Sequence, residues 1–154
     1  LCTGKLKEKF YLDAAAEYAK RLSRFCKLDI LELPEERLPE NPSPAQVEAA
    51  LSKEADAVRA KLPASCLLIA MCVEGKERSS EELARYLADS AAQGASHIVF
   101  LIGSSFGMHP SLKQQADLRL SMSPMTFPHH LLRVMLLEQI YRAYQINAGS
   151  RYHK

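Results

Sequence analysis

The chain has 154 residues, of which 47% are hydrophobic and 25% are charged, the ordinary balance of a soluble globular protein. This length predicts one domain, residues 1–154, whose core buries roughly 70% of the surface of the unfolded chain. Because no apolar run approaches the ~20 residues that span a bilayer and no secretory signal is evident, we expect a cytoplasmic protein with no membrane partner. The chain starts at Leu1, inside what resembles the end of a strand, so we expect further strand residues before it.

Charge is unevenly distributed along the chain, although the net charge is only +2. Residues 1–27 carry seven basic and three acidic side chains, and residues 101–154 carry six and two, so each end has a charge of +4. Residues 28–100 carry seven basic and thirteen acidic side chains, which gives −6. If the two ends meet in space, they form a basic face suited to a polyanion, while charge alone leaves an ordinary solvated surface open.

The cysteines and histidines show no spacing typical of a metal site. The four cysteines contain no C-x-x-C pair, and the five histidines add no ligand spacing. Most of the cysteines lie in apolar surroundings, so we expect free, buried thiols at Cys2, Cys26, Cys66 and Cys72. The sequence therefore predicts neither a disulfide nor a bound metal.

The first half of the chain predicts two helices that flank one strand. A helix is expected over Lys5–Phe25, because one stripe at helical spacing holds Leu6, Phe10, Ala14, Tyr18, Leu22 and Phe25. A strand follows at Leu28–Leu33, and then a polar, mobile loop at Glu35–Pro42. Ser43 and Gln46 form a capping box with proline at the first helical position, which predicts a helix that runs to about Leu62.

The second half alternates strands and helices more clearly. Buried strands are predicted at Cys66–Val73 and His97–Ile102, because both runs are continuously apolar. Between them come a turn at Glu74–Lys76 and a helix that begins with the Ser79/Glu82 capping box and ends at Gly94. A short helix near Pro110–Ala116, a strand near Leu118–Met122 and a last helix to about Asn147 complete the chain.

This alternation predicts an α/β domain with a mostly parallel sheet flanked by helices. Ligands of such sheets bind at the carboxyl ends of the strands. Three loops are expected to converge there: Met71–Gly75, Gly103–Gly107 and Ser121–Pro128. The two prolines of the last loop fix an irregular, stiff backbone ahead of the final helix.

The Gly103–Gly107 segment also matches the G-x-S-x-G pattern of serine hydrolases. Ser105 holds the nucleophile position, and Asp117 with His129 or His130 follows in the hydrolase order. Against this alternative, the next helix is short and starts late, the chain is small for that fold, and no second glycine-rich segment offers an oxyanion hole. The glycines are better explained by a tight turn that lets backbone approach a ligand.

The last helix is apolar nearly all round from Leu131 to Tyr144. A helix without a polar face needs partners on both sides, so we expect the sheet on one side and a second subunit, packed isologously, on the other. Glu138 and Arg142 have the i, i+4 spacing of an ion pair.

With these features in place, the chain resembles the RlmH family of SPOUT methyltransferases. The resemblance covers essentially the whole sequence and rests on Gly4–Phe10, Leu101-Ile-Gly103, Gly107, Ser121-x-Ser-x-Met-Thr-x-Pro-His129, Leu132-Arg-Val134, Glu138-Gln-x-Tyr-Arg-Ala143 and the terminal Tyr152-His153. It implies a homodimer with an α/β trefoil-knot fold that uses S-adenosyl-L-methionine. The implied reaction is methylation of N3 of a pseudouridine in 23S ribosomal RNA, on the ribosome.

The resemblance also implies the residues of the site. The cofactor-binding residues would be Met71, Cys72, Val73, Gly103, Ser104, Gly107, Ser123, Pro124, Met125, Thr126, Phe127 and Pro128. The catalytic or RNA-positioning residues would be Arg142, Tyr152 and His153, with the tail entering a partner's site. The phosphate contacts would be Lys5, Lys9, Arg133 and Arg151.

This chain departs from the family pattern at two places. Ser104 stands where relatives commonly have a second glycine, and Cys72 where they have an aspartate. Serine adds a Cβ, so the backbone there needs a φ that an L-residue tolerates. The alternative from another class is a non-catalytic RNA-binding module that uses the two basic ends and binds no cofactor.

Overall fold

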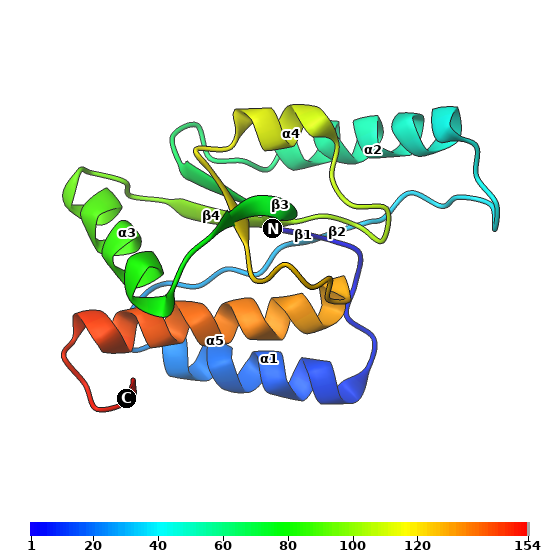
Figure 1. Ribbon diagram of the computed structural model, residues 1–154. Helices are drawn as coiled ribbons and strands as arrows, with labels where there is room; N and C mark the ends of the chain where they lie inside the picture. The colour runs from blue at the N-terminus through cyan, green and yellow to red at the C-terminus, as the bar shows by residue number, and fades with distance from the viewer. Residues whose placement is uncertain (154) are drawn as a thin grey trace.

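The structure is a computed structural model that describes residues 1–153. A central sheet is covered by helices on both faces (Figure 1). The helices are α1 (Lys9–Leu22), α2 (Pro44–Arg59), α3 (Ser80–Ala92), α4 (Pro110–Gln115) and α5 (His129–Asn147). Helices α2 and α4 lie on one face, and α1, α3 and α5 lie on the other. The predicted α/β class is confirmed.

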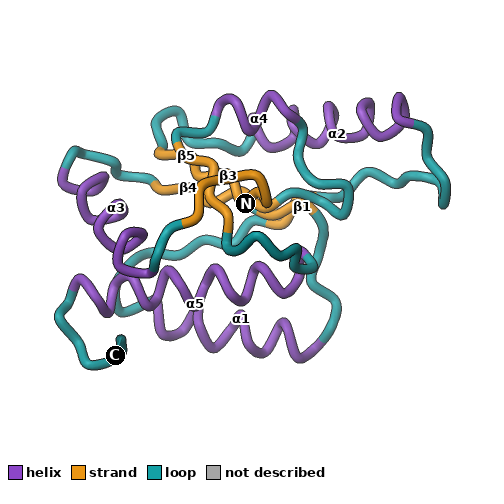
Figure 2. Tube along the Cα trace, in the orientation of Figure 1, coloured by secondary structure: helices purple, strands orange, loops and turns teal. Residues whose placement is uncertain are grey.

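The sheet contains five strands, all parallel, in the order β2-β1-β4-β3-β5 (Figure 2). Their bounds are β1 (Cys2–Thr3), β2 (Glu32–Leu33), β3 (Leu67–Glu77), β4 (Ile98–Ile102) and β5 (Leu118–Ser121). Strand β4 is central, and β3 lies between β4 and the edge strand β5. The carboxyl ends of β4, β3 and β5 are therefore neighbours, as the strand pattern predicts.

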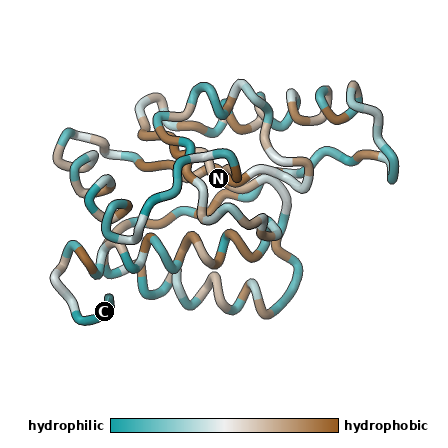
Figure 3. The backbone as a smooth tube through the Cα atoms, viewed as in Figure 1, coloured by the Kyte–Doolittle hydropathy of each residue, from teal (hydrophilic) through white to brown (hydrophobic). Residues whose placement is uncertain are grey.

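The first part of β3, residues 67–71, is apolar without interruption because helices cover it on both faces. Ile69 and Met71 belong to the core under α1, α3 and α5. Leu68 and Ala70 belong to the core under α2 and α4. Successive side chains of a strand point to opposite faces, so a strand covered on both sides needs apolar residues at every position. Figure 3 shows that hydrophobic residues gather along the sheet and on the helix faces that are turned toward it.

Two predicted elements are shorter in the structure. Helix α1 begins at Lys9 rather than Lys5, and Phe10, predicted to point inward, is 64% exposed. Residues 28–31 form no strand: β1 pairs with β2 at Cys2 and Thr3, and of the preceding residues Leu31 accepts the N–H of Cys2 at 2.9 Å. A groove of about 380 Å³ lies there, bordered by residues 27–31 and 96–100.

The predicted turn at 74–76 is wrong, because β3 continues to Glu77 and passes over β5. Leu120 of β5 pairs first with Met71 and again with Lys76. A strand can pair along both of its edges. The part of β3 that ends at Met71 therefore lies along one edge of β5, and Lys76 and Glu77 lie along the other. Gly75 lies at the crossing, where an added Cβ would stand 2.7 Å from the backbone carbon of Leu120. This crossing supports the trefoil knot that the family resemblance implies, which stays a prediction.

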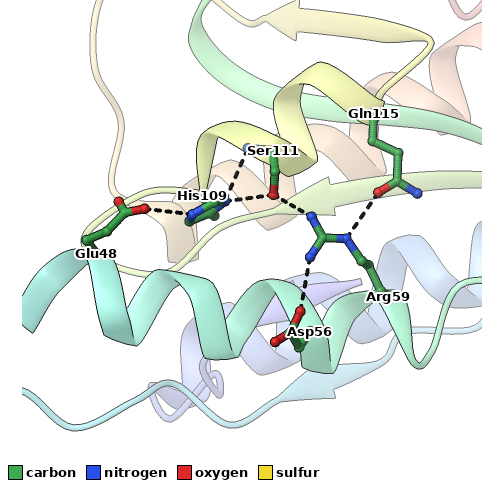
Figure 4. A network of polar contacts seen from close by, with 6 residues as sticks. All are labelled: Glu48, Asp56, Arg59, His109, Ser111 and Gln115. Carbon is green, nitrogen blue, oxygen red and sulfur yellow. Dashed lines mark hydrogen bonds and ion pairs between the residues drawn. The ribbon is translucent and has the colours of Figure 1, made fainter.

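Polar contacts fix helix α4 on helix α2 (Figure 4). Arg59 of α2 donates to Asp56, to Ser111 and to Gln115, and the last two belong to α4. His109, which precedes α4, contacts Ser111 through Nδ1 and Glu48 of α2 through Nε2 at 2.8 Å. The segment that leads out of the Gly103–Gly107 loop is thereby anchored.

Local signals at the helix starts were predicted well. The capping boxes at Ser43 and Ser79 are both present, each with a side-chain and a backbone hydrogen bond.

All four cysteines are free, with Cys2 buried and the others half-buried. None of the helices in residues 1–153 has the length and apolarity needed to cross a membrane. In the same residues, no three potential metal ligands gather.

Candidate active site

Three segments, called the three loops below, meet where β3, β4 and β5 lie side by side: residues 71–75 in the crossing part of β3, and the loops at residues 103–107 and 121–128. Each leaves one apolar side chain uncovered. Val73 is 51% exposed, Phe106 is 47% exposed and Met125 is 70% exposed. The strand registers place these loops side by side, because Met71 pairs with both Ile102 and Leu120. Exposed apolar groups on adjacent loops are typical of a surface that receives a ligand or a second chain.

The loop after β5 is shaped by its own hydroxyl groups. Ser121 Oγ donates to the carbonyl oxygen of Ser123 at 2.9 Å. Ser123 Oγ accepts a hydrogen bond from the backbone N–H of Met125 at 3.0 Å. Both hydroxyls are therefore used inside the loop, as in an ST-turn. Pro124 and Pro128 stiffen the same backbone, which leaves its remaining peptide groups available to a ligand.

The loop after β4 closes on itself so tightly that only glycine fits at its start. Ser104 N–H donates to Gly107 O, and Gly107 N–H donates to Ser104 O, both at 2.9 Å. A Cβ on Gly103 would stand 2.1 Å from Gly107 O. Ser104 itself is 6% exposed and has an ordinary negative φ, because positive φ occurs here only at glycines. The first departure from the family pattern is therefore tolerated by the backbone.

The second departure places a neutral group in the site. Burial raises the pKa of the Cys72 thiol, and the neighbouring Glu74 carboxylate adds to the effect. The thiol therefore stays protonated at neutral pH, and within residues 1–153 its hydrogen-bond acceptor is Ala70 O, at 3.8 Å. Cys72 supplies no negative charge where relatives have an aspartate.

The hydrolase alternative is wrong, because Ser105 has no catalytic partners. Its Oγ and its N–H both donate to the carboxylate of Glu35. Asp117 is occupied elsewhere and accepts the N–H of Leu68 at 2.7 Å. A nucleophilic serine needs a histidine within hydrogen-bond reach, and Ser105 Oγ has none in the described part of the chain.

The three catalytic candidates do come together, at the far end of α5. Arg142 donates to Glu138 at 2.6 Å and 3.0 Å, which confirms the predicted ion pair. Its guanidinium lies 4.9 Å from the ring centre of Tyr152 and contacts His153 Nδ1 at 3.3 Å. Tyr152 donates its hydroxyl to Glu138 at 3.2 Å, and His153 Nε2 contacts Glu81 at 2.6 Å.

This tail cluster, defined as Glu138, Arg142, Tyr152 and His153, is separated from the three loops. The loop after β5 leads into α5 at His129, whereas Arg142 lies thirteen residues further along the helix, or ~20 Å at 1.5 Å per residue. Figure 1 shows the chain end beside the last turn of α5, away from its first turn. The tail cluster therefore lies away from the loop after β5 of its own chain and beside the start of α3, where His153 contacts Glu81.

The expectation that Arg133 contacts RNA needs correction. The residue is 4% exposed, and its guanidinium donates to Glu32 at 2.9 Å and to the carbonyl oxygens of Thr3 and Gly4 at 3.0 Å. These bonds tie the first turn of α5 to the ends of β1 and β2. Lys5, Lys9 and Arg151 are exposed, as a phosphate contact requires.

Two residues near the loops were given no role in the methyltransferase site by sequence reasoning. His129 Nε2 is buried and has no hydrogen-bond partner within residues 1–153. Burial lowers the pKa of His129, and the nearby His130 and Arg133 charges lower it further, so the imidazole is neutral at pH 7. Glu35, in a loop predicted to be mobile, contacts Ser105 across the site. His129 is part of the motif that carries the resemblance, but no local pattern shows that it lies beside Glu35, because only the fold brings the two residues together.

Comparison with known proteins agrees with this geometry. A family model described as Predicted SPOUT methyltransferase matches residues 1–153. The chain belongs to this family. The resemblance noted in the sequence is thus confirmed, and the protein is a methyltransferase.

Relatives within the family are similar over their whole length. A protein of Bifidobacterium adolescentis is 47% identical over 154 residues, which cover 100% of this chain and 97% of the relative. One of Ligilactobacillus salivarius is 48% identical over 151 residues, covering 98% and 95%. Both are named Ribosomal RNA large subunit methyltransferase H.

A solved structure is also similar, but too distantly to add to the assignment. It is the SpoU methyltransferase AviRb from Streptomyces viridochromogenes in complex with AdoMet, with 18% identity and a TM-score of 0.38. The match covers 77% of this chain and 39% of that one. The SPOUT assignment rests on the family model and the relatives.

Proposed function

We propose that this SPOUT methyltransferase transfers a methyl group from S-adenosyl-L-methionine to N3 of a pseudouridine in 23S ribosomal RNA, on the ribosome and in the cytoplasm. The observation that carries the proposal is full-length identity of 45–48% to relatives named Ribosomal RNA large subunit methyltransferase H. The choice of pseudouridine N3 comes from the family resemblance. The three loops at the sheet edge supply the site that the reaction needs.

The loop residues fit this cofactor. Gly103 lets the loop close on itself, Gly107 leaves open space where a Cβ would stand, and Val73, Phe106 and Met125 offer apolar surface. When bound, the cofactor supplies a methyl group on a positively charged sulfur. We assign its binding to three loop stretches: Met71–Val73; Gly103, Ser104 and Gly107; and Ser123–Pro128. Their exposed backbone groups would hold the adenine and the methionine part by hydrogen bonds.

The site is completed by a second copy of the chain in this proposal. The tail cluster lies ~20 Å along α5 from the loop after β5 of its own chain, so in this proposal a partner's tail completes the site. The surface of α1 and α5 has the side chains for a dimer contact. Phe10 and Phe25 are 64% and 37% exposed, and Phe25 stacks on Tyr144 with ring centres 5.6 Å apart. An isologous contact between two such faces would bury these rings.

The chemistry divides between the two subunits. Methyl transfer is an in-line displacement, so positioning supplies much of the rate. N3 of the base has to lose its proton, which His153 or Tyr152 of the tail cluster would accept. Arg142 would stabilise the anion that forms. Tyr152 and His153 would orient the nucleotide. Lys5, Lys9 and Arg151 would hold neighbouring phosphates, and their contribution would weaken with salt.

The decisive experiment measures cofactor binding and locates the methyl group. We expect calorimetry to show one S-adenosylmethionine per subunit. With labelled cofactor, 70S ribosomes should be methylated at one pseudouridine, and naked ribosomal RNA should serve as the comparison substrate. A chain that binds RNA but no cofactor would instead be the non-catalytic RNA-binding module.

Mixing two inactive variants tests the shared site. His153→Ala removes a tail group, and Gly103→Ala puts a Cβ 2.1 Å from Gly107 O in the cofactor loop. In mixed dimers, one site combines an intact loop with an intact tail, so a 1:1 mixture should recover about a quarter of wild-type activity. Each variant alone should be nearly inactive. No recovery after subunit exchange, verified by native mass spectrometry, would show that each tail serves its own subunit.

A further inference from the structure

The side chain of Glu35 reaches across the site and holds the tip of the loop after β4. Its Oε1 accepts the backbone N–H of Ser105 at 2.9 Å and also the Ser105 hydroxyl. These two residues are 70 positions apart in the sequence. A carboxylate that accepts two hydrogen bonds from one residue fixes both the backbone and the side chain of that residue.

The carboxylate is ionised, as this contact requires. Burial alone would raise the pKa of Glu35, but the hydrogen bonds from the Ser105 hydroxyl and backbone, together with the His129 and His130 rings, leave the pKa below its usual value. Hydrogen bonds to a charged acceptor are about twice as strong as neutral ones. The contact is therefore present at neutral pH.

The segment that carries Glu35 is itself anchored. The N–H of the next residue, Glu36, donates to Glu54 Oε1 at 2.9 Å. Glu54 belongs to α2 and is 7% exposed. The first residues of the predicted mobile loop are thus attached to the same helix that holds His109 through Glu48 (Figure 4).

The loop after β4 is therefore held at its base by its own backbone and after its last residue by His109. Its tip, at Ser105, depends on the side chain of Glu35. Ser104 and Gly107 close the base by their two backbone hydrogen bonds. His109 is anchored behind the loop on α2. At the tip, the side-chain hydrogen bonds to Ser105 within residues 1–153 come from Glu35 alone. Phe106, the exposed apolar residue of this loop, follows directly.

We propose that Glu35 is a positioning residue of the methyltransferase, which holds Ser105 and Phe106 in the conformation that receives the cofactor. The inference rests on the proposed function, because it assigns this loop to S-adenosylmethionine. Glu35 acts through Ser105 and takes no part in the transfer itself. Its role is to keep the loop ordered before binding, which lowers the entropy lost when the ligand binds.

The first test is independent of the cofactor. Hydrogen exchange of the Ser105–Gly107 amides should be faster by an order of magnitude or more in Glu35→Ala than in wild type, because the N–H of Ser105 loses its acceptor. Glu40→Ala, in the same exposed segment, is the matched control and should leave this exchange unchanged. Equal protection in Glu35→Ala and wild type would overturn the positioning role.

The second test measures its consequence for the reaction. Glu35→Ala should raise the Kd and KM for S-adenosylmethionine by about tenfold while kcat changes much less. Glu35→Gln keeps an acceptor oxygen and should recover part of the loss. In the Glu35→Ala background, Ser105→Ala should add nothing. Unchanged KM in Glu35→Ala would overturn the inference, whereas absence of cofactor binding by wild type would overturn the proposed function.

Discussion

A Gly75→Ala variant should lose about 3 kcal/mol of stability, at the upper end of what overpacking a buried site costs. The new methyl group would stand 2.7 Å from one backbone carbon of Leu120 and 2.8 Å from that of Arg119. Backbone on both sides of the contact belongs to paired strands, so neither chain can move without breaking the β3–β5 pairing. Urea unfolding followed by circular dichroism would measure the loss.

Gly94→Ala is the matched control for the effect of losing a glycine. Gly94 has a φ of +96° but no atom within 4 Å of the position where a Cβ would stand. The stability lost in Gly94→Ala should therefore come from the strained backbone alone, of order 1 kcal/mol. If the two variants lose the same stability, the crossing of β3 over β5 is looser than the structure indicates.

An Arg133→Met variant should be destabilised by about 3–5 kcal/mol, the cost of leaving one member of a buried ion pair behind. Glu32 would lose its charged partner and keep the N–H of Leu6, and the carbonyl oxygens of Thr3 and Gly4 would lose the guanidinium donor. The contacts lie between the first turn of α5 and the ends of β1 and β2. The loss should appear as a large decrease in the urea midpoint with little change in slope.

Two comparisons isolate the cause of that loss. Adding Glu32→Gln to Arg133→Met should restore part of the stability, because the unpaired carboxylate is then gone. Arg21→Met removes an exposed ion pair with Glu17 and should leave stability unchanged within error. A mild effect of Arg133→Met alone would mean that water replaces the guanidinium, and that this end of α5 is open to solvent.

Much of the fold follows from local sequence patterns. The capping boxes at Ser43 and Ser79 give the starts of α2 and α3, because their hydrogen bonds join residues three positions apart. The unbroken apolar run of β3 predicts a strand covered on both faces, and its two cores confirm that prediction. The three convergent loops follow from strand order in a parallel sheet.

Features set by distant contacts were not predictable in this way. Arg133 looks like an exposed helix residue until Glu32 and the end of β1 are placed against it. Glu35 lies in a polar, proline-rich segment, and only the fold brings it to Ser105. The turn expected at Gly75 is a strand crossing, since glycine serves both a turn and a close approach of two backbones.

The crossing of β3 over β5 also affects how the protein comes apart. Because β5 lies between two stretches of β3, it cannot separate from the sheet sideways until Lys76 and Glu77 release it. Unfolding then needs an additional step, in which hydrogen bonds between strands are lost while the chain gains little conformational entropy. This step raises the activation barrier to unfolding, so the protein should survive brief exposure to denaturant. The same crossing slows folding, because β5 has to pair with residues of β3 that lie about forty positions earlier in the sequence.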